Sequence, residues 1–500
     1  MNKVLLFNPK SAVAKHRIPN SILNIAASVE GRYEWTIVDG NCETDPLKKI
    51  WDYLRTGAYK YIGITVMPGP QTKQAIPFSK KIKEDFPGTV IIWGGYFPTN
   101  HYKTVLESGY VDFVINGPGD HAFPRLLDAL EKNEPYELIK NLVYRTGDTI
   151  IKNAKEDLIE QDELPPLPYD KLHEMYAIDR FYLGKTYLGS RTLAYHSSIG
   201  CPFTCSFCAV VPTYEARWKA KSAQRVYNDI KYIRDKWGAN AIEFHDNNFF
   251  VSEKRTVEFS KLIRPEKMKW WGMARIDTMD RFSDSSLALL REAGCRIIFF
   301  GAESGNDAIL KQLDKGGTQS GEQILRFAER LKKFDIIPEY SFVLGTPAPT
   351  AEQVMEQIES EIRFIKKVKA VNPDTEIVLY TYSPVPTEGS ELFEKVKEAG
   401  FSFPQKLEDW ITPQWERFDL RKNPLTPWLT PEMIDRIRNF ETVLNGYYPT
   451  VSDIRLNTSR KKMLRLVAGL RYRTSFYRFP YEIKLLHRLW KYRQPEIQGF

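Results

Sequence analysis

Short apolar runs alternate with helix-like segments along most of this 500-residue chain, and each run ends in glycine, proline or small polar residues. The first series of such runs lies at Val4–Phe7, Trp35–Val38, Tyr61–Val66, Val90–Trp93 and Phe113–Ile115. Alternating strands and helices predict a parallel sheet with helices on both faces. Ligands bind such sheets at the carboxyl ends of the strands, which is where the glycines collect here.

A second series begins near residue 192 and contains six strand–helix units. Its strands are expected at Leu193–Ser197, Ala241–His245, Trp270–Ala274, Arg296–Phe300, Glu339–Leu344 and Glu376–Tyr380. Six units predict a partial (β/α)6 barrel with its site at the carboxyl ends of the strands. We therefore expect an α/β protein with a Rossmann-like parallel sheet in residues 1–135, a hairpin and proline-rich linker in 136–190, the barrel in 191–395, and a mainly helical region in 396–500.

Three of the five cysteines, Cys201, Cys205 and Cys208, lie within eight residues, directly after the first strand of the barrel. Three thiolates on one short loop can hold three corners of an iron–sulfur cube, which leaves the fourth iron open to a small molecule. Structural zinc is the main alternative, but it needs four protein ligands, and Cys42 and Cys295 are distant in sequence. A disulfide is less favoured, because spacings this short suit metal binding better.

This loop closely resembles the signature of the radical S-adenosylmethionine (SAM) enzymes, which have an aromatic residue before the last cysteine, as Phe207 is here. The resemblance implies a 4Fe-4S cluster whose open iron chelates the amino and carboxylate groups of SAM. One electron from the cluster then cleaves SAM to give a 5′-deoxyadenosyl radical. It also implies an electron donor such as flavodoxin or ferredoxin.

Polar residues follow the barrel strands in the order that this family uses to bind SAM. The resemblance assigns the SAM amino group to Asp246 and Asn247, the carboxylate to Arg275, the ribose or amino group to Glu303 and Ser304, and adenine to the backbone of Gly345, with Phe207 beside the cluster. Each residue alone indicates little, since an Arg or Glu at a strand end is more often a solvated loop charge. Their common order is what favours a SAM site.

The segments Val-Ile-Ile-Trp-Gly-Gly-Tyr-Phe-Pro-Thr and Tyr-Val-Asp-Phe-Val-Ile-Asn-Gly-Pro-Gly-Asp resemble the cobalamin-binding domain that precedes many radical SAM domains. The predicted cobalamin contacts are Pro9, Thr65, Gly69, Gly94, Gly95, Phe97, Gly117 and Gly119. The Asp-x-His-x-x-Gly motif is absent, which implies binding without a histidine on cobalt, and His16 and His101 are interpreted as ordinary surface residues. The alternative is that the glycines only form tight turns after the strands.

The basic charge of the chain is concentrated at its end. Residues 455–500 hold 12 Lys or Arg and 2 acids, whereas the rest holds 59 basic and 61 acidic residues. Met463, Leu464, Val467 and Leu470 share one helical face, and Ile483, Leu486, Leu489 and Trp490 repeat the pattern. Basic amphipathic helices can lie on anionic membranes, which predicts peripheral membrane contact. The alternative is helices packed on the barrel with a basic outer face.

No apolar run is long enough to span a membrane, the start does not read as a signal peptide, and few cysteines suit a reducing compartment, so we expect a cytoplasmic location. The predicted function is a cobalamin-dependent radical SAM methyltransferase acting on an unactivated carbon of a natural-product or lipid substrate. One alternative is a radical cyclase or carbon–carbon bond-forming enzyme acting on a lipid. The other is a non-enzymatic metal-binding protein that contacts RNA, although no RNA-recognition motif is visible and no nucleic-acid partner is expected.

Overall fold

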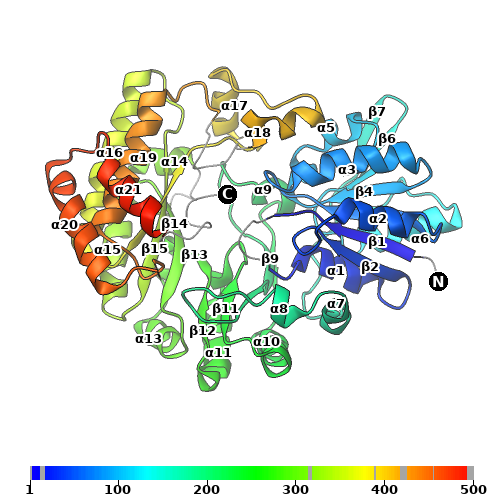
Figure 1. Ribbon diagram of the computed structural model, residues 1–500, viewed down its shortest axis with the longest axis horizontal. Helices are drawn as coiled ribbons and strands as arrows, with labels where there is room; N and C mark the ends of the chain where they lie inside the picture. The colour runs from blue at the N-terminus through cyan, green and yellow to red at the C-terminus, as the bar shows by residue number, and fades with distance from the viewer. Residues whose placement is uncertain are drawn as a thin grey trace.

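The computed structural model describes residues 3–11, 17–313, 318–387, 390–416, 425–453 and 455–491. Two sheet-containing parts lie side by side, the N-terminal one at the right of Figure 1 and the second at its lower left and centre. Helices from the C-terminal part of the chain cover the far side of the second part. The α/β class, the order of the two sheets and the helical C-terminal region are as predicted.

The N-terminal sheet has the strand order β2-β1-β3-β4-β5-β6-β7. Its strands are β1 (Lys3–Asn8), β2 (Glu34–Asp39), β3 (Tyr59–Thr65), β4 (Val90–Gly94), β5 (Phe113–Ile115), β6 (Leu142–Thr146) and β7 (Thr149–Lys152). The first five are parallel, whereas β6 pairs antiparallel with β5 and β7 pairs antiparallel with β6. The hairpin expected in the linker therefore extends the sheet.

Helices cover both faces of this sheet, because its strands are apolar on both sides. One face packs against α1 (Asn20–Val29) and α6 (Ala122–Lys132). The other packs against α2 (Pro46–Leu54), α3 (Thr72–Asp85) and α5 (Tyr102–Glu107). The short helix α4 (Tyr96–Asn100), which the sequence did not indicate, follows β4 at the carboxyl edge.

The six predicted parallel strands are present in the second part, as two sheets of order β12-β11-β8 and β13-β14-β15-β16. They are β8 (Thr192–Tyr195), β11 (Ala241–Phe244), the broken strand β12 (Lys269–Trp271) and β13 (Met273–Arg275), β14 (Ile297–Glu303), β15 (Ile337–Leu344) and β16 (Glu376–Thr381). Gly272 separates β12 from β13, and its carbonyl still accepts a hydrogen bond from the backbone N–H of Phe299 at 3.1 Å. A short antiparallel pair, β9 (Ser198–Gly200) and β10 (Trp218–Ala220), lies beyond the end of β8.

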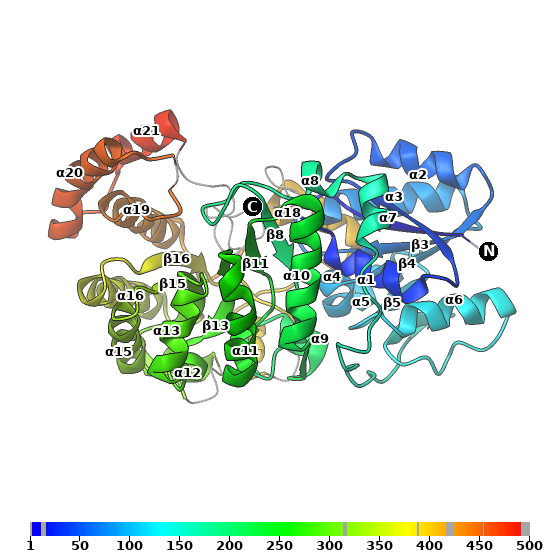
Figure 2. The same cartoon turned by 90° about the horizontal axis from the view of Figure 1, so that it is seen from below.

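Helices follow the barrel strands on the outside of the sheet (Figure 2). They are α10 (Ala223–Trp237), α11 (Glu253–Ile263), α12 (Ile276–Met279), α13 (Asp284–Glu292), α14 (Asp307–Gln312), α15 (Gly321–Lys332) and α16 (Ala351–Val371), with the 3-10 turns η1 (Phe249–Val251) and η2 (Arg264–Glu266). Before the barrel come α7 (Tyr169–Met175) and α8 (Ile178–Phe181), and α9 (Val210–Tyr214) follows the cysteine loop.

The C-terminal region divides into two parts. The first consists of α17 (Glu391–Glu398), η3 (Leu407–Ile411) and α18 (Pro413–Glu416), and the second of α19 (Pro431–Tyr447), α20 (Thr458–Thr474) and α21 (Tyr481–Trp490). Figure 2 shows the second part standing on the side of the barrel away from the N-terminal sheet. Within the described residues, no helix is both long and apolar enough to span a membrane.

The aromatic segment before α19 returns to the N-terminal sheet. Trp410 packs against Phe97 at 5.0 Å between ring centroids and against His101 at 4.5 Å, and Phe403 also contacts His101. His101 is therefore packed among aromatic rings, and its interpretation as an ordinary surface residue is wrong. His16 lies outside the described residues.

Candidate active site

The carboxyl edge of the N-terminal sheet meets the carboxyl edge of the barrel. Tyr96, which follows β4, donates a hydrogen bond from its hydroxyl to Oδ1 of Asn247, which follows β11, at 3.1 Å. The Tyr96 ring also meets the ring of Tyr214 in α9 edge-on at 6.5 Å. A Cβ at Gly117, after β5, would lie 3.3 Å from the carbonyl oxygen of Thr213. The cysteine loop and α9 therefore lie where the two edges join.

The cysteine loop is shaped by one glycine and fixed by backbone hydrogen bonds. Gly200 has φ +75°, and a Cβ there would overlap the carbonyl oxygen of Arg217, so only glycine fits. That carbonyl accepts a hydrogen bond from Cys201 N–H at 3.0 Å. The backbone N–H of Ser206 donates to the carbonyl of Leu313 at 3.1 Å, which ties the loop to the end of α14.

The donor set of the loop fits an iron–sulfur cluster. Cys201, Cys205 and Cys208 form no disulfide with any described residue, and all three are half-buried. In the described part of the chain no three His, Cys, Asp or Glu side chains gather tightly enough to hold one metal ion. A cube takes its thiolates at separate corners, so ligands spread along a loop suit it.

Arg275, which ends β13, lies against the cysteine loop. It donates to Cys205 Sγ at 3.2 Å and to both carboxylate oxygens of Asp277 at 3.0 and 2.7 Å, and its guanidinium lies 3.9 Å from the centre of the Phe203 ring. Burial alone would lower its pKa, but Asp277 and the neighbouring thiols outweigh burial and raise the pKa. The structure thus places a buried cation beside the sulfur ligands.

Asp246 and Asn247 face different partners. Asp246 is buried and accepts hydrogen bonds from Ser197 N–H at 2.8 Å and from the hydroxyls of Ser197 and Ser198 at 3.0 and 2.6 Å. Burial raises the pKa of Asp246, although these hydrogen bonds act to lower it. Asp246 therefore fixes the turn that leads into the cysteine loop, whereas Asn247 contacts the first sheet through Tyr96.

Asn248 follows Asp246 and Asn247 after β11. Its side chain is 1% exposed, and its amide oxygen and nitrogen have no hydrogen-bond partner among the described residues. A buried polar group without a partner is costly. An amide of this kind beside Asn247 is a candidate for contact with a ligand.

The end of β14 separates the two residues predicted there. Glu303 is buried with φ +62°, which is strained for a residue with a side chain, and Ser341 donates to its carboxylate at 3.5 Å. Ser304 instead hydrogen-bonds to Glu361 of α16, which also accepts from Gly305 N–H at 2.9 Å. Ser304 is thus engaged in the packing of α16, and Glu303 remains with the strand ends.

The C-terminal region covers Gly345. This residue has φ +78°, and a Cβ there would lie 2.6 Å from Leu429. Its carbonyl accepts a hydrogen bond from Trp428 Nε1 at 3.0 Å. Phe207, which precedes Cys208, packs with an apolar cluster that includes Tyr382 and Phe393.

The predicted cobalamin contacts lie at the carboxyl edge of the first sheet with little side-chain bulk. A Cβ at Gly94 would lie 3.9 Å from its nearest neighbour, and a Cβ at Gly69 would have no described atom within 4 Å. A Cβ at Gly119, by contrast, would lie 2.7 Å from Ile25. Gly95 has φ +101°, and a Cβ there would lie 2.9 Å from the carbonyl oxygen of Val66.

The remaining predicted contacts differ in how they are placed. The hydroxyl of Thr65 lies 3.2 Å from the hydroxyl of Ser21, and Pro9 is buried just after β1. Phe97 is fully buried against Trp93 and Trp410, so its ring belongs to the core behind the edge.

The barrel contains acidic residues that the sequence analysis did not single out. Glu243 accepts from Arg17 at 3.1 Å and lies 3.3 Å from His245 Nε2, and Glu339 accepts from Trp271 Nε1 at 3.1 Å. Burial and the charges of Glu339, Glu243 and Glu376 raise the pKa of Tyr187. Each of these acids lies in an otherwise apolar strand, where a charged residue is rarely buried without a partner. An acidic residue within an apolar run was therefore the sequence signal that could have identified them.

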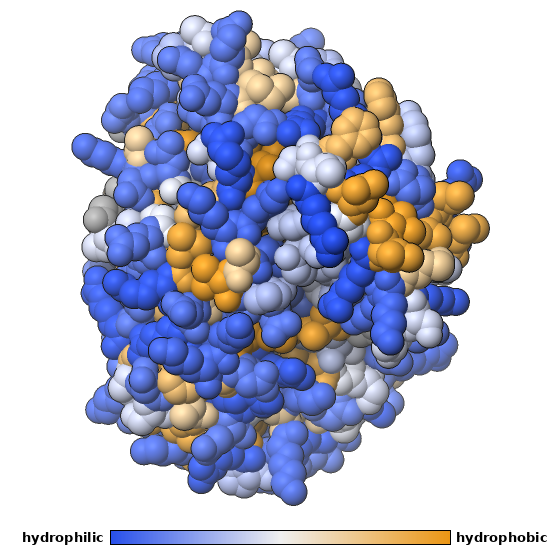
Figure 3. All heavy atoms as spheres, turned by 90° about the vertical axis from the view of Figure 1, so that its left-hand side faces the viewer, coloured by the Kyte–Doolittle hydropathy of each residue, from blue (hydrophilic) through white to orange (hydrophobic). Residues whose placement is uncertain are grey.

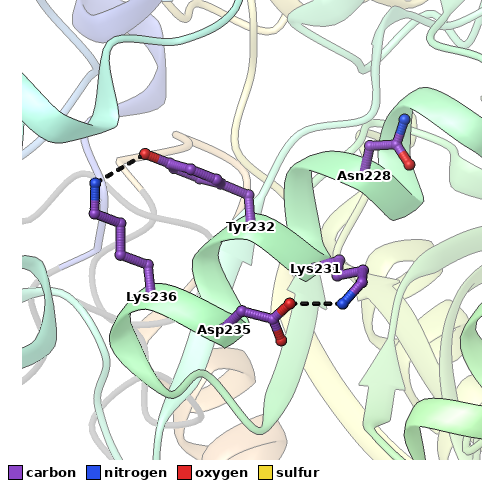
Figure 4. Close-up of a pocket in the computed structure, with 5 residues that line it drawn as sticks. All are labelled: Asn228, Lys231, Tyr232, Asp235 and Lys236. Carbon is purple, nitrogen blue, oxygen red and sulfur yellow. Dashed lines mark hydrogen bonds and ion pairs between the residues drawn. The ribbon is translucent and has the colours of Figure 1, made fainter.

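A separate surface hollow lies on the outer face of α10 (Figure 4). It is lined by Asn228, Lys231, Tyr232, Asp235 and Lys236, all from that helix. Lys231 pairs with Asp235 at 2.6 Å, and Lys236 donates to the Tyr232 hydroxyl at 3.1 Å. These pairs are ordinary for a solvated helix face and bear no relation to the strand ends.

Two family models match the chain. The model described as the Radical SAM superfamily matches residues 195–360, and the model described as the B12 binding domain matches residues 12–127. The first spans the cysteine loop and the strand ends of the barrel through Gly345. The second spans the parallel strands β2 to β5 and the glycines that follow them in the N-terminal sheet.

Curated relatives cover most of the chain. An uncharacterised methyltransferase of Pyrococcus horikoshii is 27% identical over 404 residues, which cover 78% of this chain and 82% of the relative. The anaerobic magnesium-protoporphyrin IX monomethyl ester cyclase of Synechocystis is 25% identical over 303 residues, which cover 60% of this chain and 57% of the cyclase.

Among solved structures, the cobalamin-dependent S-adenosylmethionine radical enzyme OxsB, with aqua-cobalamin and S-adenosylmethionine bound, matches with a TM-score of 0.69. The match covers all of this chain and 74% of that one at 16% sequence identity. At this identity the likeness concerns the fold, namely a parallel sheet followed by a partial barrel.

Proposed function

We propose that this chain, which is a radical SAM enzyme with an N-terminal B12-binding domain, transfers a methyl group to an unactivated carbon of its substrate. The radical SAM and B12-binding matches cover the two parts whose carboxyl edges meet. The relative from Pyrococcus horikoshii, whose match covers 78% of this chain, is described as a methyltransferase.

The observation that carries the proposal is the contact between the two edges. Tyr96 follows a strand of the first sheet, Asn247 follows a strand of the second, and a single hydrogen bond of 3.1 Å joins them. Because both edges are the ligand-binding edges of their sheets, ligands bound at the two edges would lie close together. Methyl transfer between two cofactors and one substrate requires this proximity.

Some residues of this chain would hold the ligands, and others exclude water from the site. Cys201, Cys205 and Cys208 would hold a 4Fe-4S cluster, and the bare glycines of the first edge would admit the flat corrin ring of cobalamin. When bound, the cluster and SAM supply a hydrogen-abstracting radical, and cobalamin supplies a methyl group. Trp428 and Leu429 cover the far strand end at Gly345, which helps to keep water from the site.

Arg275 and Asp246 orient the cysteine loop. The cation of Arg275 donates to Cys205 Sγ and so stabilises negative charge on the ligating sulfur. Asp246 holds Ser197 and Ser198 in the turn before the loop. The strained Glu303 and the amide of Asn248, which has no partner among the described residues, also lie at strand ends, and we assign them to SAM contacts.

The substrate class that we propose is a natural product or a lipid, and the electron donor is a flavodoxin- or ferredoxin-like protein. A second candidate function is ring closure by the same radical site. It is favoured by the similarity to the anaerobic cyclase of Synechocystis, which covers 60% of this chain.

The test is anaerobic reconstitution of the full-length protein with iron, sulfide and cobalamin, followed by reaction with SAM that carries an isotopically labelled methyl group. Methyl transfer predicts a corrin spectrum retained after desalting, 5′-deoxyadenosine formation, and labelled methyl in the product. Deoxyadenosine together with an unlabelled, dehydrogenated or cyclised product would support the second candidate. If no deoxyadenosine forms under strong reduction, both candidates fail.

A further inference from the structure

Helices α20 and α21 present apolar side chains to solvent. Exposed side chains line one stripe of α20, a connecting turn, and one stripe of α21. They are Met463 (44% exposed), Leu466 (81%), Leu470 (72%), Phe476 (54%), Phe479 (61%), Tyr481 (67%), Leu485 (56%) and Leu489 (65%). Figure 3 looks onto the side of the molecule that carries α20 and shows a group of orange apolar side chains among blue ones at its right-hand edge.

This outward stripe differs from the single apolar face predicted for each helix. Leu464, Ala468 and Tyr472 of α20 and Ile483 of α21 are buried, so each helix has an apolar inner face as well. The inner faces are closely packed, since a Cβ at Gly446 of α19 would lie 3.0 Å from Ala468 and 3.2 Å from Ile483. The outward-facing leucines therefore take no part in the packing of α19, α20 and α21 against one another.

Positive charge surrounds the outer stripe. Residues 455–491 contain eleven Lys or Arg and one acid, Glu482, which is paired with Arg471. Many of these cations are exposed around the stripe, among them Lys462, Arg473, Arg478 and Arg488. The barrel and the N-terminal sheet carry no comparable excess, because the rest of the sequence is nearly neutral.

We propose that α20 and α21 form a docking surface for an anionic lipid membrane. Apolar side chains on a rigid support, ringed by Lys and Arg, are the features of helices that lie in the membrane interface. Contact with a second copy of this surface would bring two strongly basic faces together, which electrostatic repulsion disfavours. An anionic bilayer offers an apolar interior to the leucines and negatively charged headgroups to the Lys and Arg side chains.

Attachment through this surface is peripheral and depends on salt. The leucines insert only to the depth of the headgroup boundary, and the cations act through a field that salt screens. This inference is independent of the reaction that the active site performs.

The test uses the full-length, cofactor-reconstituted protein and co-sedimentation with phosphatidylcholine vesicles, with and without phosphatidylglycerol. We expect binding to vesicles that contain phosphatidylglycerol at low salt, and loss of about tenfold or more in partitioning at high salt or on neutral vesicles. Absence of binding to anionic vesicles at low salt would overturn the proposal.

Two sets of variants separate the apolar and basic contributions. Replacing Leu466, Leu470, Leu485 and Leu489 by Ser should abolish binding with little loss of stability, because these side chains are exposed. The matched control is Leu138→Ser, which removes a leucine that is 93% exposed in the N-terminal part and should leave binding unchanged. Arg473→Gln with Arg488→Gln should weaken binding, and the corresponding Arg→Lys changes should preserve it.

Size-exclusion chromatography of the same proteins tests the competing occupant. A self-associated protein that ignores vesicles, and that becomes monomeric when the four leucines are changed, would assign the surface to a second copy and overturn the membrane proposal. The cofactor spectra of every variant should match the wild type, so that a failure here is distinct from a failure of the proposed reaction.

Discussion

The two carboxyl edges that meet at Tyr96 and Asn247 are built in opposite ways. The edge of the N-terminal sheet consists mainly of glycines, and its one large predicted contact, Phe97, is turned into the core. The edge of the barrel consists of cysteines, acids and a buried arginine, and most of its polar groups contact one another. The first edge leaves space for a ligand because it has few side chains, whereas the second edge provides polar side chains that can contact a ligand.

This difference indicates what each edge can bind. A surface of glycines suits a large, flat ligand, which gains affinity from contact area and main-chain approach. A surface of paired charges suits a small polar ligand and a metal cluster, which need donors at fixed positions. Changes at the barrel edge should therefore have chemical effects, and changes at the first edge should have steric ones.

The largest effect is expected at the cysteine loop. Replacing Cys201, Cys205 or Cys208 by Ala removes one of three thiolate ligands and should abolish both iron–sulfur absorbance and 5′-deoxyadenosine formation. Iron and sulfide analysis with product chromatography measures both. Cys42→Ala is the control, since Cys42 is another half-buried thiol in the N-terminal part and should leave the cluster intact. A triple variant that still forms deoxyadenosine would contradict the assignment.

The next effect is expected at Arg275. Arg275→Gln leaves Asp277 buried, at 3% exposure, without its charged partner, which should cost about 3–5 kcal/mol in the free energy of unfolding. The double variant Arg275→Gln/Asp277→Asn should recover most of that stability. Both variants should lower the reduction potential of the cluster, because a cation beside Cys205 favours the reduced, more negative state.

Denaturant unfolding and redox titration separate these two consequences of the Arg275 change. If the double variant recovers stability and also has the wild-type potential, Arg275 serves only to neutralise Asp277.

At the first edge, two neighbouring glycines provide a matched pair. Gly95→Ala forces a side chain into φ +101° and against Val66, which should cost about 1–3 kcal/mol. A Cβ at Gly94 makes only ordinary van der Waals contact, 3.9 Å from Ile115, so Gly94→Leu should change stability by less than about 0.5 kcal/mol while blocking cobalamin. Thermal unfolding and the corrin spectrum after desalting measure the two effects. Retention of cobalamin by Gly94→Leu would place the corrin elsewhere.

The smallest effect concerns the support behind the first edge. Burial among Phe97, Phe403 and Trp410 lowers the pKa of His101 to about 3. The folded state therefore binds fewer protons than the unfolded state between pH 6.5 and about 3, and stability falls as the pH decreases through that window. His101→Phe should reduce this loss by about 1.4 kcal/mol per pH unit below pH 6.5.

Urea unfolding at pH 6.5 and 5.5 tests the His101 prediction. Burial also lowers the pKa of His196 to about 3, so a part of the acid sensitivity should persist in the variant. An unchanged pH dependence would mean that His101 is accessible to protons in the folded protein.

The features that the sequence predicted well are local ones. The strands of the barrel and the five parallel strands of the first sheet begin and end within one or two residues of their expected positions, except that β14 continues three residues further, to Glu303. Each is a compact apolar run bounded by glycine or polar residues. The cysteine spacing is local too. The order of polar residues after the strands predicted Arg275 at the carboxyl edge, and it contacts Cys205 of the loop there, since parallel strands bring their carboxyl ends together.

The features that were missed depend on contacts between distant segments. Ser304 follows its strand as expected, but it is turned toward Glu361, 57 residues away. Trp410 and Phe403 pack behind the first sheet, against Phe97 and His101. The basic tail has an apolar outer face because its inner face is already filled by Leu464 and Ala468. Periodicity shows that a face is apolar, but only the neighbouring helix decides which face is covered.

The N-terminal sheet is built from one continuous segment of the sequence, which affects the order of folding during synthesis. All seven of its strands lie within residues 3–152, whereas α9 and the aromatic segment that later contact its edge and its rear come after residue 200. Domains generally fold as units in the order in which the ribosome releases them. We therefore expect the glycine edge to form while it is still uncovered, so that a bulky cofactor can enter during synthesis, before the barrel folds against it.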